Sequence, residues 1–83
     1  MNIYVGNLDF KVSENDLEGI FKPFGNVSSV KIITDKYTGR SRGFGFVTME
    51  DSTEAGKAIE ELNGTTVINR EIVVNEARPR RDS

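Results

Sequence analysis

The 83-residue chain contains no cysteine and no histidine. Without cysteine there is neither a disulfide framework nor a thiolate metal site. Without histidine the chain lacks the commonest general base, the commonest metal ligand and the usual partner of a serine or cysteine nucleophile. These absences argue against an enzyme, and they favour a protein that uses no metal ion and no cofactor.

Long hydrophobic runs are also missing. No stretch is long and apolar enough to span a membrane, and residues 1–10 do not resemble a signal peptide. We therefore expect a cytoplasmic protein with no membrane partner. A chain of 83 residues accommodates one small domain, and we expect it to be a monomer.

Positive charge is scarce for a nucleic-acid-binding protein, because the net charge is −2. The acidic residues, however, concentrate in two segments, 13–22 and 51–62, which hold seven acidic and two basic residues. The rest of the chain holds six acidic and nine basic residues, a net charge of +3. A weakly basic surface on an acidic body can still bind a polyanion through a few phosphate contacts.

The two acidic segments are predicted to be helices. Each begins with a capping residue, Ser13 or Asp51, and has an acidic residue three positions later, which resembles a capping box. Each then repeats apolar residues at helical spacing. These residues are Leu17, Ile20, Phe21 and Phe24 in the first helix, and Ala55, Ala58, Ile59 and Leu62 in the second. Gly19 lies inside the first helix, where close packing against a strand would explain it.

Alternating or β-branched apolar residues predict strands at residues 2–6, 27–34, 42–49 and 71–76. A short extended piece is expected at 65–68, before a turn at Asn69 and Arg70. The order β-α-β-β-α-β is typical of the ferredoxin-like α+β fold, a two-layer sandwich in which two helices cover one face of a four-stranded antiparallel sheet. Right-handed crossovers place the first and third strands in the centre of that sheet.

The most informative segment is Arg42-Gly43-Phe44-Gly45-Phe46-Val47-Thr48-Met49. In a strand, Phe44 and Phe46 share one face. Phenylalanine is usually buried, so this segment alone could place both rings in the core. The topology favours the opposite, because both helices cover the other face and nothing in the sequence covers this one. Tyr4, on the adjacent central strand, is then expected on the same open face.

This segment resembles an octamer of the RNA recognition motif (RRM) family, K/R-G-F/Y-G/A-F-V-x-F/Y. Residues 42–47 match it at every position, and Met49 replaces the final aromatic at a position that should face the core. Residues 3–8 resemble the partner hexamer of the family. The resemblance covers residues 1–79 and is greatest to small single-RRM bacterial proteins and to the RRM of plant glycine-rich RNA-binding proteins.

The resemblance implies a domain at residues 1–78, followed by a short basic tail at 79–83. It also implies single-stranded RNA as the partner. Tyr4 and Phe46 would stack on bases, Phe44 would pack between sugars, and Arg42 would pair with phosphate. Further residues at outward, strand-end or loop positions would contact RNA: Lys31, Ile33, Asn75, Ala77, Arg78, Arg40 and Lys36.

The function implied is non-catalytic binding of single-stranded RNA, with a role in post-transcriptional regulation or as an RNA chaperone. Three alternatives remain open at this point. The rings would accept single-stranded DNA as readily as RNA, and an RRM scaffold could instead bind proteins through its helices. An acylphosphatase-like enzyme would need a phosphate-binding glycine-rich loop before a helix, which the sequence lacks.

Overall fold

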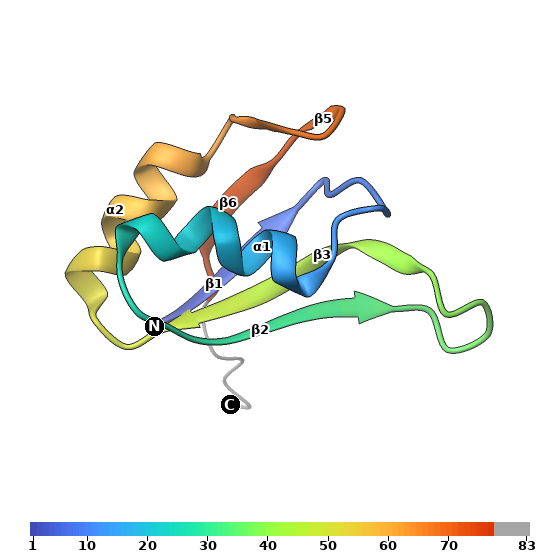
Figure 1. Cartoon of the computed structure of the whole chain (residues 1–83), viewed down its shortest axis with the longest axis horizontal. Helices are drawn as coiled ribbons and strands as arrows, with labels where there is room; N and C mark the ends of the chain where they lie inside the picture. The colour runs from blue at the N-terminus through green and yellow to red at the C-terminus, as the bar shows by residue number, and fades with distance from the viewer. Residues whose placement is uncertain (78–83) are drawn as a thin grey trace, which may run out of the picture.

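A computed structural model describes residues 1–77 of the chain (Figure 1). The domain boundary expected at residue 78 and the tail at 79–83 lie outside these residues. The elements, in chain order, are β1 (Asn2–Gly6), α1 (Glu14–Phe21), a 3-10 turn (Lys22–Phe24), β2 (Val27–Thr34), β3 (Ser41–Met49), α2 (Ser52–Leu62), β4 (Thr66–Val67), β5 (Arg70–Glu71) and β6 (Val73–Glu76).

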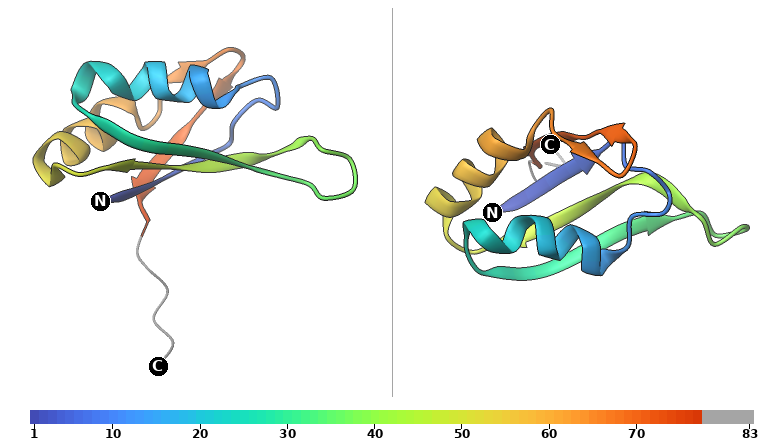
Figure 2. Two further views of the ribbon diagram at one scale, coloured as in Figure 1. Left: turned by 60° about the horizontal axis from the view of Figure 1, so that its bottom comes forward. Right: turned by 45° about the horizontal axis from the view of Figure 1, so that its top comes forward.

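Four of the strands form one antiparallel sheet in the order β2-β3-β1-β6. Both helices lie on the same face of this sheet, and the other face carries no helix (Figure 2). This arrangement confirms the ferredoxin-like α+β sandwich, with β1 and β3 in its centre. Neither helix within residues 1–77 is long and apolar enough to cross a membrane.

The capping box predicted from the sequence is complete at α1 but only half formed at α2. Ser13 Oγ accepts a hydrogen bond from the Asp16 N–H at 3.1 Å, and the Asp16 carboxylate accepts one from the Ser13 N–H at 3.0 Å, which completes the capping box. At α2, Asp51 accepts from the N–H groups of Thr53 and Glu54 at 2.8 and 3.0 Å. The reciprocal hydrogen bond, in which the Asp51 N–H would donate to the Glu54 carboxylate, is not formed, because this carboxylate lies against Gly25 instead.

The core lies between the helices and the sheet. It buries the inward residues of the four strands together with the apolar stripes of both helices, among them Ile3, Val5, Leu17, Phe21, Val47, Met49, Ala55, Ala58 and Val74. Met49 is fully buried, as its strand position predicted. The explanation expected for Gly19 is wrong, because this residue is exposed and a Cβ there would meet nothing within 4 Å.

The last strand is shorter than predicted. The Ile72 N–H donates to the Thr65 carbonyl at 2.9 Å, and the Ile72 carbonyl accepts from the Gly64 N–H at 2.9 Å. Because Ile72 bonds to the segment after α2, the sheet strand β6 begins only at Val73. The extended piece expected at 65–68 is present as β4, which pairs with β5, and the turn between them falls one residue earlier than predicted, at Ile68 and Asn69.

Candidate nucleic-acid interface

Three aromatic rings gather on the face of the sheet opposite the helices. They are Tyr4 on β1 and Phe44 and Phe46 on β3, and their strand neighbours Ile3, Val5 and Val47 point into the core. The ring centroids lie 5.9–6.3 Å apart, with the Tyr4 and Phe44 rings inclined by 30° and the other two pairs near edge-to-face. The rings are half-buried and not fully bare, because they pack on one another.

The strand register aligns four side chains of this face in one row. Lys31 on β2 is opposite Phe46 on β3, Phe46 is opposite Tyr4 on β1, and Tyr4 is opposite Asn75 on β6. Neighbouring strands lie about 4.8 Å apart, so the row is about 14 Å long across the three intervals. We call these four residues the cross-sheet row. It has a cation at one edge, an amide at the other and two rings between them.

Gly6 lets the Tyr4 ring lie along the sheet. A Cβ atom at Gly6 would collide with the Oη, Cζ and Cε2 atoms of Tyr4, so the ring occupies the space above this glycine. The ring thus lies over the β1 backbone beside Phe44. Sequence reasoning took Gly6 only as the end of a strand; a glycine two positions after an aromatic, on the same strand face, was the signal available.

Basic residues border the rings at one end of β3. Arg42 is exposed at the start of this strand, and Lys36 and Arg40 are exposed on the loop that joins β2 to β3. Asp35 opens that loop. Hydrogen bonds from the Tyr37 and Thr38 N–H groups, and the nearby Arg42 guanidinium, hold the pKa of the Asp35 carboxyl below its usual range.

The remaining predicted residues lie around the same face. Ile33 follows Lys31 by two positions on β2 and is half-buried. Ala77 comes directly after β6, and its N–H donates to the Asn2 carbonyl at 2.8 Å, which fixes the chain beside β1. Arg78 lies outside the described residues.

The comparison with protein families identifies the chain. The family model of the RNA recognition motif matches residues 3–73, which is most of the chain. The chain belongs to the RNA recognition motif family. This RRM domain is 50% identical over 80 residues to RbpA of Synechocystis sp., a protein named for RNA binding. The aligned residues cover 96% of this chain and 79% of RbpA.

Solved structures agree with this assignment. The crystal structure of RNA binding protein PG1 is 52% identical to this RRM domain, with a TM-score of 0.92, and the match covers 99% of both chains. A structure described as an Sxl-lethal protein/RNA complex is 33% identical, with a TM-score of 0.91, and the match covers 99% of this chain and 49% of the other.

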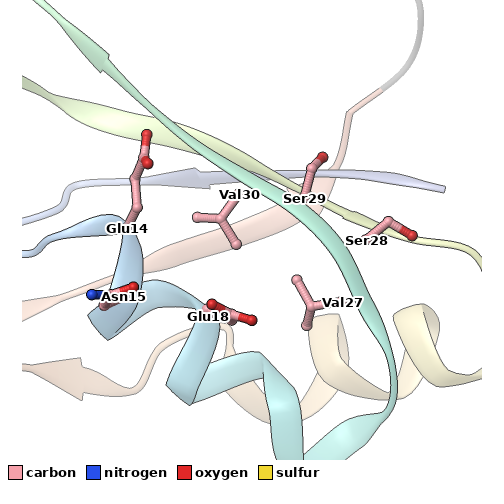
Figure 3. A pocket seen from close by; sticks show the side chains of 7 residues that line it. All are labelled: Glu14, Asn15, Glu18, Val27, Ser28, Ser29 and Val30. Atoms are coloured by element: carbon pink, nitrogen blue, oxygen red, sulfur yellow. The ribbon is translucent and has the colours of Figure 1, made fainter.

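The RRM domain also has a hollow on its other side, between α1 and the edge strand β2 (Figure 3). It is lined by Glu14, Asn15, Glu18, Val27, Ser28, Ser29 and Val30. The Glu14 carboxylate accepts from the Ile32 N–H at 3.3 Å and so satisfies one group on the free edge of β2. Two carboxylates make this hollow unfavourable for a phosphate. Within residues 1–77, no three acidic side chains lie close enough together to hold a metal ion.

Proposed function

We propose that this RRM domain binds single-stranded RNA on the open face of its sheet and performs no chemistry. The observation that supports this most strongly is the cross-sheet row, in which Phe46 and Tyr4 lie on adjacent central strands between Lys31 and Asn75. Aromatic rings on a sheet offer their faces to unstacked bases, which is how single strands are commonly recognised. The family and the Sxl-lethal protein/RNA complex support the same proposal.

In this proposal each ring has a separate role. Tyr4 and Phe46 each stack on one base, and Phe44 packs against the sugars between them. The Phe44 and Phe46 rings meet edge to face, with their centroids 6.3 Å apart. This contact holds both side chains in place while the two rings stay nearly perpendicular. One stacked base contributes about 1–3 kcal/mol, so two stacks and a few polar contacts give a micromolar affinity, about −8 kcal/mol.

The polar contacts come from the ends of the row and from the start of β3. Lys31 and Arg42 would neutralise phosphates, and the Asn75 amide can both donate to and accept from a base edge. Backbone groups near Ala77, together with Arg78 and Arg40, would add contacts at the edges of the face. Because these groups are few and the chain carries a net charge of −2, the affinity should depend only weakly on salt.

An RNA-binding module of this kind would serve in the cytoplasm as a post-transcriptional regulator or an RNA chaperone. Stacking accepts single-stranded DNA as well as RNA. The preference between them is therefore a separate measurement from the site itself. Parallel titrations with RNA and DNA pools of the same length would measure it.

The test of the stacking site is Phe46→Ala. An NMR titration with a random-sequence RNA pool should show at least about tenfold weaker binding, equivalent to about 1.4 kcal/mol and within the range for one lost stack. Phe10→Ala is the control, because Phe10 is an exposed phenylalanine that lies outside the ring cluster, in the loop before α1, where it lines a hollow with Val12, Ile32 and Gly39 among others. Unchanged binding by a folded Phe46→Ala protein would contradict the proposal, and amide shifts confined to the helices would favour a protein-binding role.

A further inference from the structure

Tyr37 is the most exposed large apolar side chain among the described residues. Its exposed fraction is 94%, whereas Tyr4, the other tyrosine, is half-buried in the ring cluster. The Tyr37 side chain makes no hydrogen bond and no ring contact within residues 1–77. The ring therefore makes little contact with the rest of the domain and is accessible to a partner.

Hydrogen bonds within the loop hold the segment that carries Tyr37. The Asp35 carboxylate accepts from the Tyr37 and Thr38 N–H groups at 2.7 and 3.2 Å, and the Asp35 carbonyl accepts from the Gly39 N–H at 2.9 Å. The Asp35 N–H in turn donates to the Arg40 carbonyl at 2.8 Å and closes the loop. The Tyr37 side chain is therefore presented from a pre-formed turn, which lowers the entropy cost of using it in binding.

The surroundings of Tyr37 are basic in an otherwise acidic chain. Residues 31–42 contain Lys31, Lys36, Arg40 and Arg42 but only one acidic residue, a net charge of +3, so the rest of the chain carries −5. The single acid, Asp35, is engaged by the N–H groups of its own loop. An exposed ring among cations is the combination that binds a base and its phosphates in single strands.

The loop lies at the end of the β2–β3 hairpin, beyond the end of β3 nearest the ring cluster. It extends the β2–β3 hairpin past the end of β1, as Figures 1 and 2 show. Phe46 pairs with Lys31 and Ser41 pairs with Thr34, three residues further along β2, so the loop joins β3 about 10 Å from Phe46 at 3.3–3.4 Å per residue. Arg42 and Phe44 lie along this path. A strand of RNA that crosses the row must therefore continue past Arg42 to reach the loop.

We propose that Tyr37 is a further base-stacking residue, which takes up a nucleotide that flanks those on the sheet and so extends the site along the β2–β3 hairpin. The inference rests on the function proposed above, because it requires RNA on the open face. It assigns a role to a ring outside the two family motifs. It also predicts that the length of the RNA decides whether Tyr37 contributes.

The test compares Tyr37→Ala with Phe46→Ala on random-sequence RNA pools of about three and about nine nucleotides, lengths chosen to cover one or two stacks or more. Tyr37→Ala should weaken binding of the longer pool by about fivefold, the low end for one stacked base, and leave the short pool unaffected. Phe46→Ala should weaken both. Tyr37→Phe should bind as the parent does, because stacking uses the ring and not the hydroxyl.

The chain also supplies its own optical probe. It contains no tryptophan and two tyrosines, so a Tyr4→Phe protein fluoresces from Tyr37 alone. The longer pool should quench this emission and the short pool should not. This inference alone would be overturned if Phe46→Ala lost binding while Tyr37→Ala bound the longer pool normally and the fluorescence of Tyr37 was not quenched. It would also be overturned if Tyr37→Phe weakened binding as much as Tyr37→Ala. Unchanged binding by Phe46→Ala would overturn the function proposed above.

Discussion

Replacing Gly45 by alanine should damage the sheet more than its small size suggests. Gly45 lies between Phe44 and Phe46 on β3 and is fully enclosed on its core side. An added Cβ would collide with the Lys31 carbonyl oxygen, and it would lie 3.1 Å from the Ile32 Cα and 3.3 Å from the Lys31 carbonyl carbon. All of these are backbone atoms of the paired strand β2, which cannot rotate away as a side chain can.

The magnitude follows from what must move. Overpacking of this kind costs about 1–3 kcal/mol, and separating the two strands at Lys31 weakens a ladder hydrogen bond worth about 1 kcal/mol. A loss of about 2–4 kcal/mol is a large part of the stability of a small domain. For a domain of this size it should lower the melting temperature by at least about 8 °C.

Thermal unfolding followed by circular dichroism measures this effect, and two other glycines supply the control. Gly19 and Gly56 lie inside α1 and α2, where a Cβ would meet nothing within 4 Å. Alanine at either position should stabilise the protein by about 0.5–1 kcal/mol. If Gly45→Ala melted together with the wild type, the close approach of β2 to β3 would not be what requires glycine there.

Two further predictions concern the open face and its loop. Gly6→Ala should displace the Tyr4 ring from the space above residue 6 and weaken RNA binding while Phe46 stays in place; a titration with unchanged affinity would show that the ring position is not needed. The pKa of Asp35 is lowered by hydrogen bonds from the Tyr37 and Thr38 N–H groups and, to a smaller extent, by Arg42. The ionised carboxylate therefore stabilises the loop fully above the unfolded-state pKa of Asp35. This stabilisation is lost as the pH falls through the lower folded-state pKa. In an acid titration, the Tyr37 and Thr38 amide signals should therefore move at a pH below the usual aspartate range, and a midpoint at or above that range would refute the assignment.

The sequence alone predicted the parts of the fold that repeat with a short period. Alternation along β1 and β3 separated Ile3, Val5 and Val47 from the rings, and the structure has these three residues buried. Capping residues and apolar stripes located both helices within a few residues. The open face followed from a count of layers, because two helices on one side of the sheet leave the other side uncovered.

Features that depend on a neighbouring strand could not be predicted in this way. The sequence placed Lys31 and Asn75 on the outward side of their strands, but only the register aligns them with Phe46 and Tyr4 in one row. Gly45 is required by the backbone of β2, which is adjacent in space and 13 residues away at Ile32. Periodicity carries no information on such contacts between segments.

The limits of β6 have the same cause. The periodicity from residue 71 to 76 is continuous, yet the backbone of Ile72 bonds to Gly64 and Thr65 and not to β1. The sheet register begins one residue later, with Val73 opposite Gly6. A pattern of apolar residues shows which face is buried, but the hydrogen-bond partner of a strand end depends on which segment lies beside it in the folded chain.

The cross-sheet row exists only in the folded protein, and this bears on how the domain could bind. Tyr4 and Phe46 are 42 positions apart in the chain, and β1 and β3 are neighbours in the sheet although α1 and β2 lie between them in the sequence. An isolated β2–β3 hairpin would retain Phe44, Phe46 and the basic loop but would lack Tyr4 and Asn75. Because the two stacking rings come from strands in the centre of the sheet, their spacing is fixed by the ladder between those strands. Binding and folding therefore depend on the same backbone contacts, and a substitution that separates β1 from β3 should abolish both together.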